Sequence, residues 1–177
     1  MSDEGRATPY AGMYRGTVAN NVDPLLRGRL QVIVPDVLGV VPSSWAEPCS
    51  PLAGPTGPPM GVYLVPPIGT GVWVAFEHGE PDLPVWVGCR WGGPSDVPPL
   101  AHLGLPISPN IVLQTAGQNS IVISDLPGPT GGIMLKSTTG ATLIVNDTGI
   151  YIQNGKGASI TLTGPTVNVN LGALTVI

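Results

Sequence analysis

Apolar and polar residues alternate along two stretches near the start of the chain, and this period of two is the pattern of half-buried β-strands. The stretches are residues 14–22 and 28–34, which are separated by Asn, Asp and Pro residues that favour a turn. In the second stretch Leu30, Val32 and Val34 share one face. Pro35 ends it, because proline cannot donate a backbone hydrogen bond to a sheet.

The clearest alternation predicts a β-hairpin over residues 71–77 and 83–90. The sequence Gly-Glu-Pro-Asp at residues 79–82 supplies the turn chemistry at its tip. One face of each strand is apolar: Val72, Val74 and Phe76 in the first, and Val85, Val87 and Cys89 in the second. About five strands within roughly 80 residues, without a long helical pattern, predict a small closed barrel.

The second half of the chain repeats a shorter pattern, in which two aliphatic residues stand two positions apart. The pairs are Ile121/Ile123, Ile133/Leu135, Leu143/Val145, Ile150/Ile152, Ile160/Leu162 and Val167/Val169. Turns rich in Gly, Asn, Asp and Thr separate them. This spacing predicts a β-solenoid, or intertwined chains that build one, because strands this short cannot bury both faces within one chain. Half of an ordinary β-sandwich is the alternative interpretation, and the near absence of aromatic residues disfavours it.

Composition supports an all-β protein and excludes several other classes. The 177 residues include 25 Gly and 21 Pro, the two residue types least compatible with a helical bundle. With 42% hydrophobic and 10% charged residues, the chain has enough apolar surface to fold. Seven basic and eleven acidic residues leave no basic surface for nucleic acid. So few charges indicate that much of the surface is covered by identical copies or partners.

These patterns together predict an all-β chain with a small closed barrel of about five strands, followed by a β-solenoid or by intertwined chains that build one. The expected segments are an N-terminal tail at residues 1–12, the barrel at 13–92, a Pro- and Gly-rich linker at 93–109 and the β-helix at 110–177. The N-terminal residues contain no apolar core of a signal peptide, so we expect assembly in the cytoplasm.

Candidate chemistry is sparse, and we expect a non-enzyme without a cofactor or bound metal. The only dense polar cluster is residues 77–82, Glu-His-Gly-Glu-Pro-Asp. It contains metal-binding residue types, but its place in the predicted hairpin favours a solvated turn. His102 is expected to be structural or exposed. Cys49 and Cys89 could form a disulfide, although two buried free thiols are the preferred interpretation.

Three segments resemble the spike proteins of contractile tails. Residues 14–35, YRGTVANNVDPLLRGRLQVIVP, look like the start of the oligonucleotide/oligosaccharide-binding (OB) type barrel of that family. Residues 67–88, PIGTGVWVAFEHGEPDLPVWVG, match its hairpin motif at nearly every defined position. Residues 119–125, NSIVISD, resemble the entry into its C-terminal β-helix. The family includes phage baseplate spikes, valine–glycine repeat (VgrG) proteins of type VI secretion and spikes of extracellular contractile injection systems.

The resemblance implies that the barrel is an OB-type five-stranded barrel and that it is followed by an intertwined trimeric β-helix. It also implies a homotrimer whose three barrels sit on a hub protein and whose C-terminal segments form a membrane-puncturing needle. Ile and Val would fill the needle axis, and Thr, Asn and Ser would face water. We expect a PAAR-type tip protein to dock on the last residues, Leu174, Thr175, Val176 and Ile177. The resemblance does not distinguish a phage tail from an injection or secretion system, and the near-periodic pairs leave the strand register of the needle open.

A nucleic-acid-binding module on the same barrel is the alternative function. It would bind single strands through stacking tryptophans and phosphate-binding arginines. The candidate residues are Trp73, Trp86 and Trp91 with Arg27, Arg29 and Arg90. A secreted carbohydrate-active β-helix ranks last, because the sequence shows neither a signal peptide nor paired carboxylates for a groove.

Overall fold

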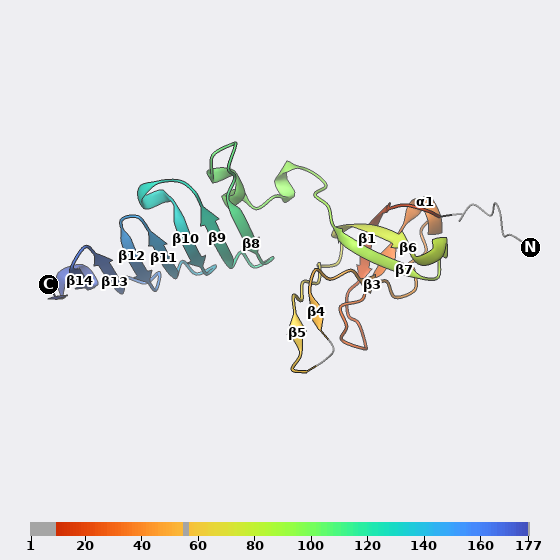
Figure 1. Ribbon diagram of the computed structural model, residues 1–177, viewed down its shortest axis with the longest axis horizontal. Helices are drawn as coiled ribbons and strands as arrows, with labels where there is room; N and C mark the ends of the chain where they lie inside the picture. Colours follow the sequence, from red (N-terminus) through yellow and green to blue (C-terminus); the bar gives the residue numbers. More distant parts are fainter. Residues whose placement is uncertain (1–9, 55–56, 177) are drawn as a thin grey trace, which may run out of the picture. The chain divides into compact units, whose positions relative to one another are not determined.

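The computed structural model describes residues 10–54 and 57–176, and its contacts divide the chain into two units, Met1–Gly92 and Gly93–Ile177. Both units are built from β-strands, and Figure 1 shows them as a barrel and a row of successive strands. The only α-helix in the described part of the chain is α1, Pro35–Leu38, which is four residues long. The prediction of an all-β fold is therefore confirmed.

The first unit contains a five-stranded sheet that is closed into a barrel. The strands follow the order β2-β1-β6-β7-β3, with bounds β1 Tyr14–Asn20, β2 Gln31–Ile33, β3 Glu47–Pro48, β6 Gly71–Phe76 and β7 Pro84–Cys89. Leu30, just before β2, and Ala46, just before β3, exchange backbone hydrogen bonds of 3.1 and 2.7 Å. These bonds join the two edge strands, so the barrel leaves no free edge along this seam.

The barrel core is small and mostly aliphatic. Its buried residues are Val18, Leu30, Val32, Val34, Ala46, Val72, Val74, Phe76 and Trp86. The predicted inward faces of residues 28–34 and 71–77 are confirmed. Gly16 is required where β1 pairs with β6, because a Cβ atom there would lie 2.9 Å from Val74 Cγ2.

The predicted face of the hairpin's second strand is wrong. In β7 the buried residues are Pro84 and Trp86, whereas Val87 and Cys89 are exposed. The register between β6 and β7 shifts by one residue beside Val87, since Trp73 pairs with Gly88 but Val74 pairs with Trp86. Such a bulge reverses which side chains face the core, and simple alternation cannot predict it.

A two-stranded arm leaves the barrel between β3 and β6. It consists of β4, Ala53–Gly54, and β5, Met60–Gly61, which pair with each other and with no other strand (Figure 1). An apolar groove of about 610 Å³ lies between this arm and β7. Cys49 and Cys89 line the groove as free, solvent-exposed thiols, so the prediction that they are buried is wrong.

The second unit is a single antiparallel sheet of eight strands in sequence order (Figure 1). The strands are β8 Ile111–Gln114, β9 Ser120–Ser124, β10 Gly132–Lys136, β11 Thr142–Asn146, β12 Gly149–Gln153, β13 Ser159–Thr163, β14 Thr166–Val169 and β15 Leu174–Val176. Each predicted aliphatic pair lies within one of these strands. One copy of the chain therefore forms a single layer with two open faces, and closing it into a helix requires further copies.

Candidate functional site

Two columns of aliphatic side chains run across one face of the eight-stranded sheet. Directly paired residues of neighbouring antiparallel strands point to the same face, so the columns follow from the strand register. The first column is Ile111, Ile123, Ile133, Val145, Ile150, Leu162 and Val167. The second column is Leu113, Ile121, Leu135, Leu143, Ile152, Ile160, Val169 and Leu174. We call this surface the axial face.

The axial face is largely uncovered in one copy of the chain. Many of its central members, such as Ile133, Leu135 and Ile152, keep 38–48% of their surface exposed. An apolar surface of this length without a charge is unusual on a monomeric protein and marks an interface with another protein. Full burial of an exposed aliphatic side chain is worth about 1.5–3 kcal/mol, and these side chains are already about half buried. Each therefore contributes about 1 kcal/mol on assembly, and the two columns together can hold a large assembly.

The opposite face is mostly polar, but its middle column changes along the sheet. In the first four strands this column consists of Val112, Val122, Met134 and Ile144, and Val122 is buried. From β12 onwards it consists of Tyr151, Thr161 and Asn168. The expectation that Thr, Asn and Ser face water therefore holds for this column in β13 and β14. It is wrong for β8 to β11, which place Val, Met or Ile there, and for β12, which places Tyr151 there.

The residues proposed to receive a tip protein lie at the far end of this sheet. Leu174 begins β15, the last strand, which pairs with β14 alone, and its side chain is exposed. Thr175 and Val176 complete the strand, and Ile177 lies outside the described residues. The docking role of these four residues stays a prediction.

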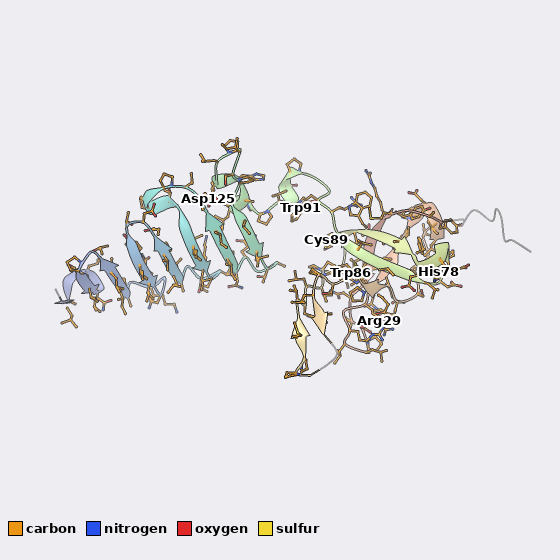
Figure 2. The ribbon with its side chains drawn as sticks, in the orientation of Figure 1. Arg29, His78, Trp86, Cys89, Trp91 and Asp125 are labelled. Carbon is orange, nitrogen blue, oxygen red and sulfur yellow. The ribbon has the colours of Figure 1, made fainter. Side chains whose placement is uncertain are left out.

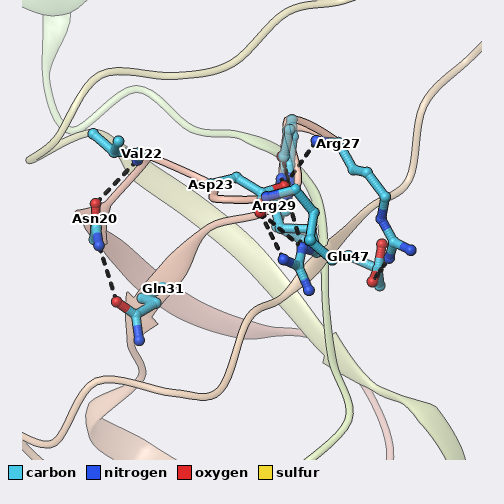
Figure 3. Close-up of polar contacts among 10 residues, drawn as sticks. Asn20, Val22, Asp23, Arg27, Arg29, Gln31 and Glu47 are labelled. Atoms are coloured by element: carbon cyan, nitrogen blue, oxygen red, sulfur yellow. Dashed lines mark hydrogen bonds and ion pairs between the residues drawn. The ribbon is translucent and has the colours of Figure 1, made fainter.

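In the barrel, the loop between β1 and β2 is organised around the buried carboxylate of Asp23 (Figure 3). Its oxygens accept backbone hydrogen bonds from Leu25, Arg27 and Arg29 at 2.9, 2.8 and 3.2 Å. The guanidinium of Arg29 also donates to it, with the shortest distance 2.6 Å from Nη2. Arg27 forms an ion pair with Glu47 beside this cluster. The sequence reasoning missed this arrangement, although an Asp-Pro turn followed by Arg is a local signal for it.

The charge of Arg29 and the backbone donors hold the pKa of the Asp23 carboxyl well below its ordinary value, against the opposing effect of burial. A carboxyl whose pKa is lowered on folding stabilises the protein above its unfolded pKa of about 4, and this stabilisation is lost as the pH falls towards the folded pKa. Asp23 should therefore make the barrel sensitive to acid.

Asp23→Asn should lower the melting temperature of the barrel at pH 7 by several degrees and flatten its dependence on pH below about 5. The amide keeps the shape of the carboxylate but loses the charge that the three N–H groups and Arg29 bind. Tryptophan fluorescence can follow the transition, because all four tryptophans lie in residues 45–91. If the melting temperatures of the variant and the unmodified chain fall in parallel as the pH is lowered, Asp23 does not have this role.

The structure does not assemble the surface required by the nucleic-acid alternative. Trp86 is only 8% exposed, and its indole Nε1 donates to the carbonyl of Gly28 at 3.1 Å, so it cannot stack on a base (Figure 2). Arg29 is bound to Asp23. The Arg15 guanidinium lies over the Trp73 ring, 5.9 Å from its centroid. Trp86 and Arg29 therefore have structural roles within the barrel and are not available to nucleic acid, whereas Trp91 is 63% exposed.

The acidic cluster of residues 77–82 forms the exposed turn between β6 and β7. Two backbone hydrogen bonds stabilise this turn: the Glu80 N–H donates to the Glu77 carbonyl, and the Leu83 N–H donates to the Glu80 carbonyl. His78 has a φ of 54° at this turn and is exposed (Figure 2). Within residues 10–54 and 57–176 no group of His, Cys, Asp and Glu side chains is arranged to hold a metal ion. Over the same residues, no helix has the length and hydropathy of a membrane span.

Two family models match the chain, and they correspond to its two units. Residues 14–91 match the type VI secretion system/phage-baseplate injector OB domain. Residues 110–175 match the phage baseplate V C-terminal trimerisation domain. A search of curated proteins finds no match. The second match covers the axial face almost completely, so the surface that is open in one copy lies in a domain known for trimerisation.

Proposed function

Because the chain belongs to the phage baseplate V family of baseplate spike proteins, we propose that it is the central spike that links a hub protein to a tip protein and punctures the target membrane. The family consists of structural components of baseplates, and its trimerisation domain makes the protein a homotrimer.

The axial face is the observation that carries this proposal. Three copies can bury their axial faces against one another around a common axis, which gives a rod with an aliphatic interior. In such a rod the backbone hydrogen bonds of the strands and the close packing of the interior resist deformation. Resistance to compression is what a protein driven through a membrane by a contracting sheath needs.

We assign the two ends of the spike to different partners. The barrel matches an injector OB domain and is the part that docks on the hub. The residues at and after the start of the last strand, Leu174–Ile177, are the docking site for a PAAR-type tip protein. Support for this comes from β15, whose outer edge is unpaired in the described part of the chain and can accept further strands.

Two shortened chains test these assignments separately. Particles assembled with a chain truncated after Gly93 should keep the protein on the baseplate but should no longer release dye from liposomes when the sheath contracts. A chain lacking residues 174–177 should remain trimeric by light scattering and should lose the tip protein in a pull-down. The chain with Gln153→Asp, which changes an exposed outer-face residue, is the control.

The outcomes contradict different parts of the proposal. Dye release by the truncated chain would exclude puncture by residues 94–177. Unchanged capture of the tip protein after deletion of residues 174–177 would exclude the proposed docking site. Loss of the truncated chain from the baseplate would place hub binding outside the barrel.

A further inference from the structure

The segment before the first strand of the sheet is ordered, although its composition predicts a linker. Residues 93–109 contain the 3-10 helices η2, Pro94–Asp96, and η3, Pro99–Leu103. Asn110 Nδ2 donates to the Leu100 carbonyl at 2.8 Å, and Ser108 Oγ donates to Asp125 Oδ2 at 2.7 Å. Asp125 follows β9 (Figure 2), so this segment is attached to the sheet itself.

The fixed conformation of this segment leaves several apolar side chains exposed to solvent. Leu105 and Ser108 form a tight turn, with a hydrogen bond of 3.0 Å from Ser108 N to the Leu105 carbonyl, and Pro106 and Ile107 occupy its tip. Ile107 is 94% exposed, the highest value among the large hydrophobic residues that the structure describes. Leu103 and Leu105 are also exposed. Fixing three aliphatic side chains in a solvent-exposed conformation costs conformational entropy, and a flexible linker would have no contact that compensates for this cost.

The exposed segment continues directly into the axial face. Ile111 and Leu113 are the β8 members of the two columns, and they are 65% and 58% exposed, more than most members further along the sheet. Residues 97–124 contain no Asp, Glu, Lys or Arg. The exposed aliphatic residues of this segment therefore adjoin the β8 members of both columns in sequence, with no charged residue between them.

The columns themselves do not determine how three chains align along the axis. Their members are Ile, Leu and Val throughout, so a chain displaced by two strands, about 10 Å, still places aliphatic residues against aliphatic residues. A unique alignment requires a feature that occurs once. The segment at residues 103–107 is such a feature, because it is aperiodic and tied to one end of the sheet.

We propose that residues 103–107 form a clasp that packs on the neighbouring copies at the β8 end of the trimer and sets their axial register. The partner of this surface is a second copy of the same chain, since the clasp is continuous with the face on which the copies meet. The proposal depends on the homotrimer and not on the hub, the tip or membrane puncture.

The test compares Ile107→Ser with Leu171→Ser in the isolated full-length protein. Both residues are more than nine-tenths exposed in one copy, but Leu171 lies between β14 and β15, at the other end of the sheet. Ile107→Ser should lower the melting temperature of the trimer by about 10 °C, because three buried aliphatic contacts are lost. Ser108→Ala, which removes the bond to Asp125, should lower it by a smaller amount. Leu171→Ser should leave it unchanged.

The register is measured with a spin label at Thr161→Cys on the outer face, in a chain with Cys49→Ser and Cys89→Ser. Aligned copies place the three labels at one level, so the unmodified clasp should give one narrow distance. Ile107→Ser should add longer distances from displaced copies. A melting temperature and a distance distribution unchanged by Ile107→Ser would overturn the proposal, as would a broad distribution with the clasp intact.

Discussion

Replacing Ile152 with Asp should convert the trimer into a monomer. Ile152 belongs to the second column of the axial face and pairs with Leu143 on one side and Ile160 on the other. In a trimer the substitution would bring three carboxylates into an aliphatic interior without cations to pair with them. Burial of an unpaired charge costs several kcal/mol, and the cost is incurred in each of three copies. Light scattering should therefore give 18.2 kDa in place of three times that mass.

The adjacent residue provides the control for this substitution. Gln153→Asp adds the same charge to the same strand, but Gln153 lies on the opposite face and is exposed. It should leave the molar mass at the value of the trimer. A trimeric Ile152→Asp protein would show that the axial face is not the surface on which the copies meet.

Leu30→Ala should destabilise the barrel by about 2–5 kcal/mol, the cost of a cavity in a well-packed core. Leu30 is fully buried and is at the same time the residue whose backbone joins the two edges of the sheet through Ala46. Denaturant unfolding followed by tryptophan fluorescence measures the effect on the barrel alone, because residues 93–177 contain no tryptophan.

Leu25→Ala is the matched control, since it removes the same atoms from a leucine that is exposed in the β1–β2 loop. Its effect should not exceed about 0.5 kcal/mol. Equal losses for the two variants would mean that Leu30 is not part of the cooperative core. Unchanged molar mass in both variants would show that the barrel and the trimer interface can be altered independently.

Much of the candidate site could be predicted from local patterns. The aliphatic pairs identify six of the eight strands of the second unit, β9 to β14, and their shortness already indicates that one chain cannot bury both faces. The hairpin motif around residues 67–88 identifies the barrel family. The docking of a hub and a tip protein, by contrast, depends on surfaces of other chains, and the sequence of one chain supports it only by resemblance.

The features that sequence reasoning misassigned depend on contacts between distant residues. Arg29 and Trp86 were candidates for binding nucleic acid, but one is held by Asp23 and the other donates to the Gly28 carbonyl. Residues 93–109 were expected to link the two domains, and their composition does not indicate the hydrogen bonds that attach them to the sheet. The Asp-Pro turn before Arg29 is a local signal for the first of these contacts, but no local pattern indicates the others.

By itself the sequence determined the all-β class, the longer strands of the barrel, six of the eight strands of the second unit and the apolar character of the axial face. Alternation and turn chemistry can do this because they are properties of neighbouring residues. Only the tertiary structure decided the bulge beside Val87, the closure of the barrel through Leu30 and Ala46, and the pairing that aligns the two columns. These features depend on which backbone groups form hydrogen bonds between strands. A shift of one residue in that pairing exchanges the buried and exposed faces of a strand.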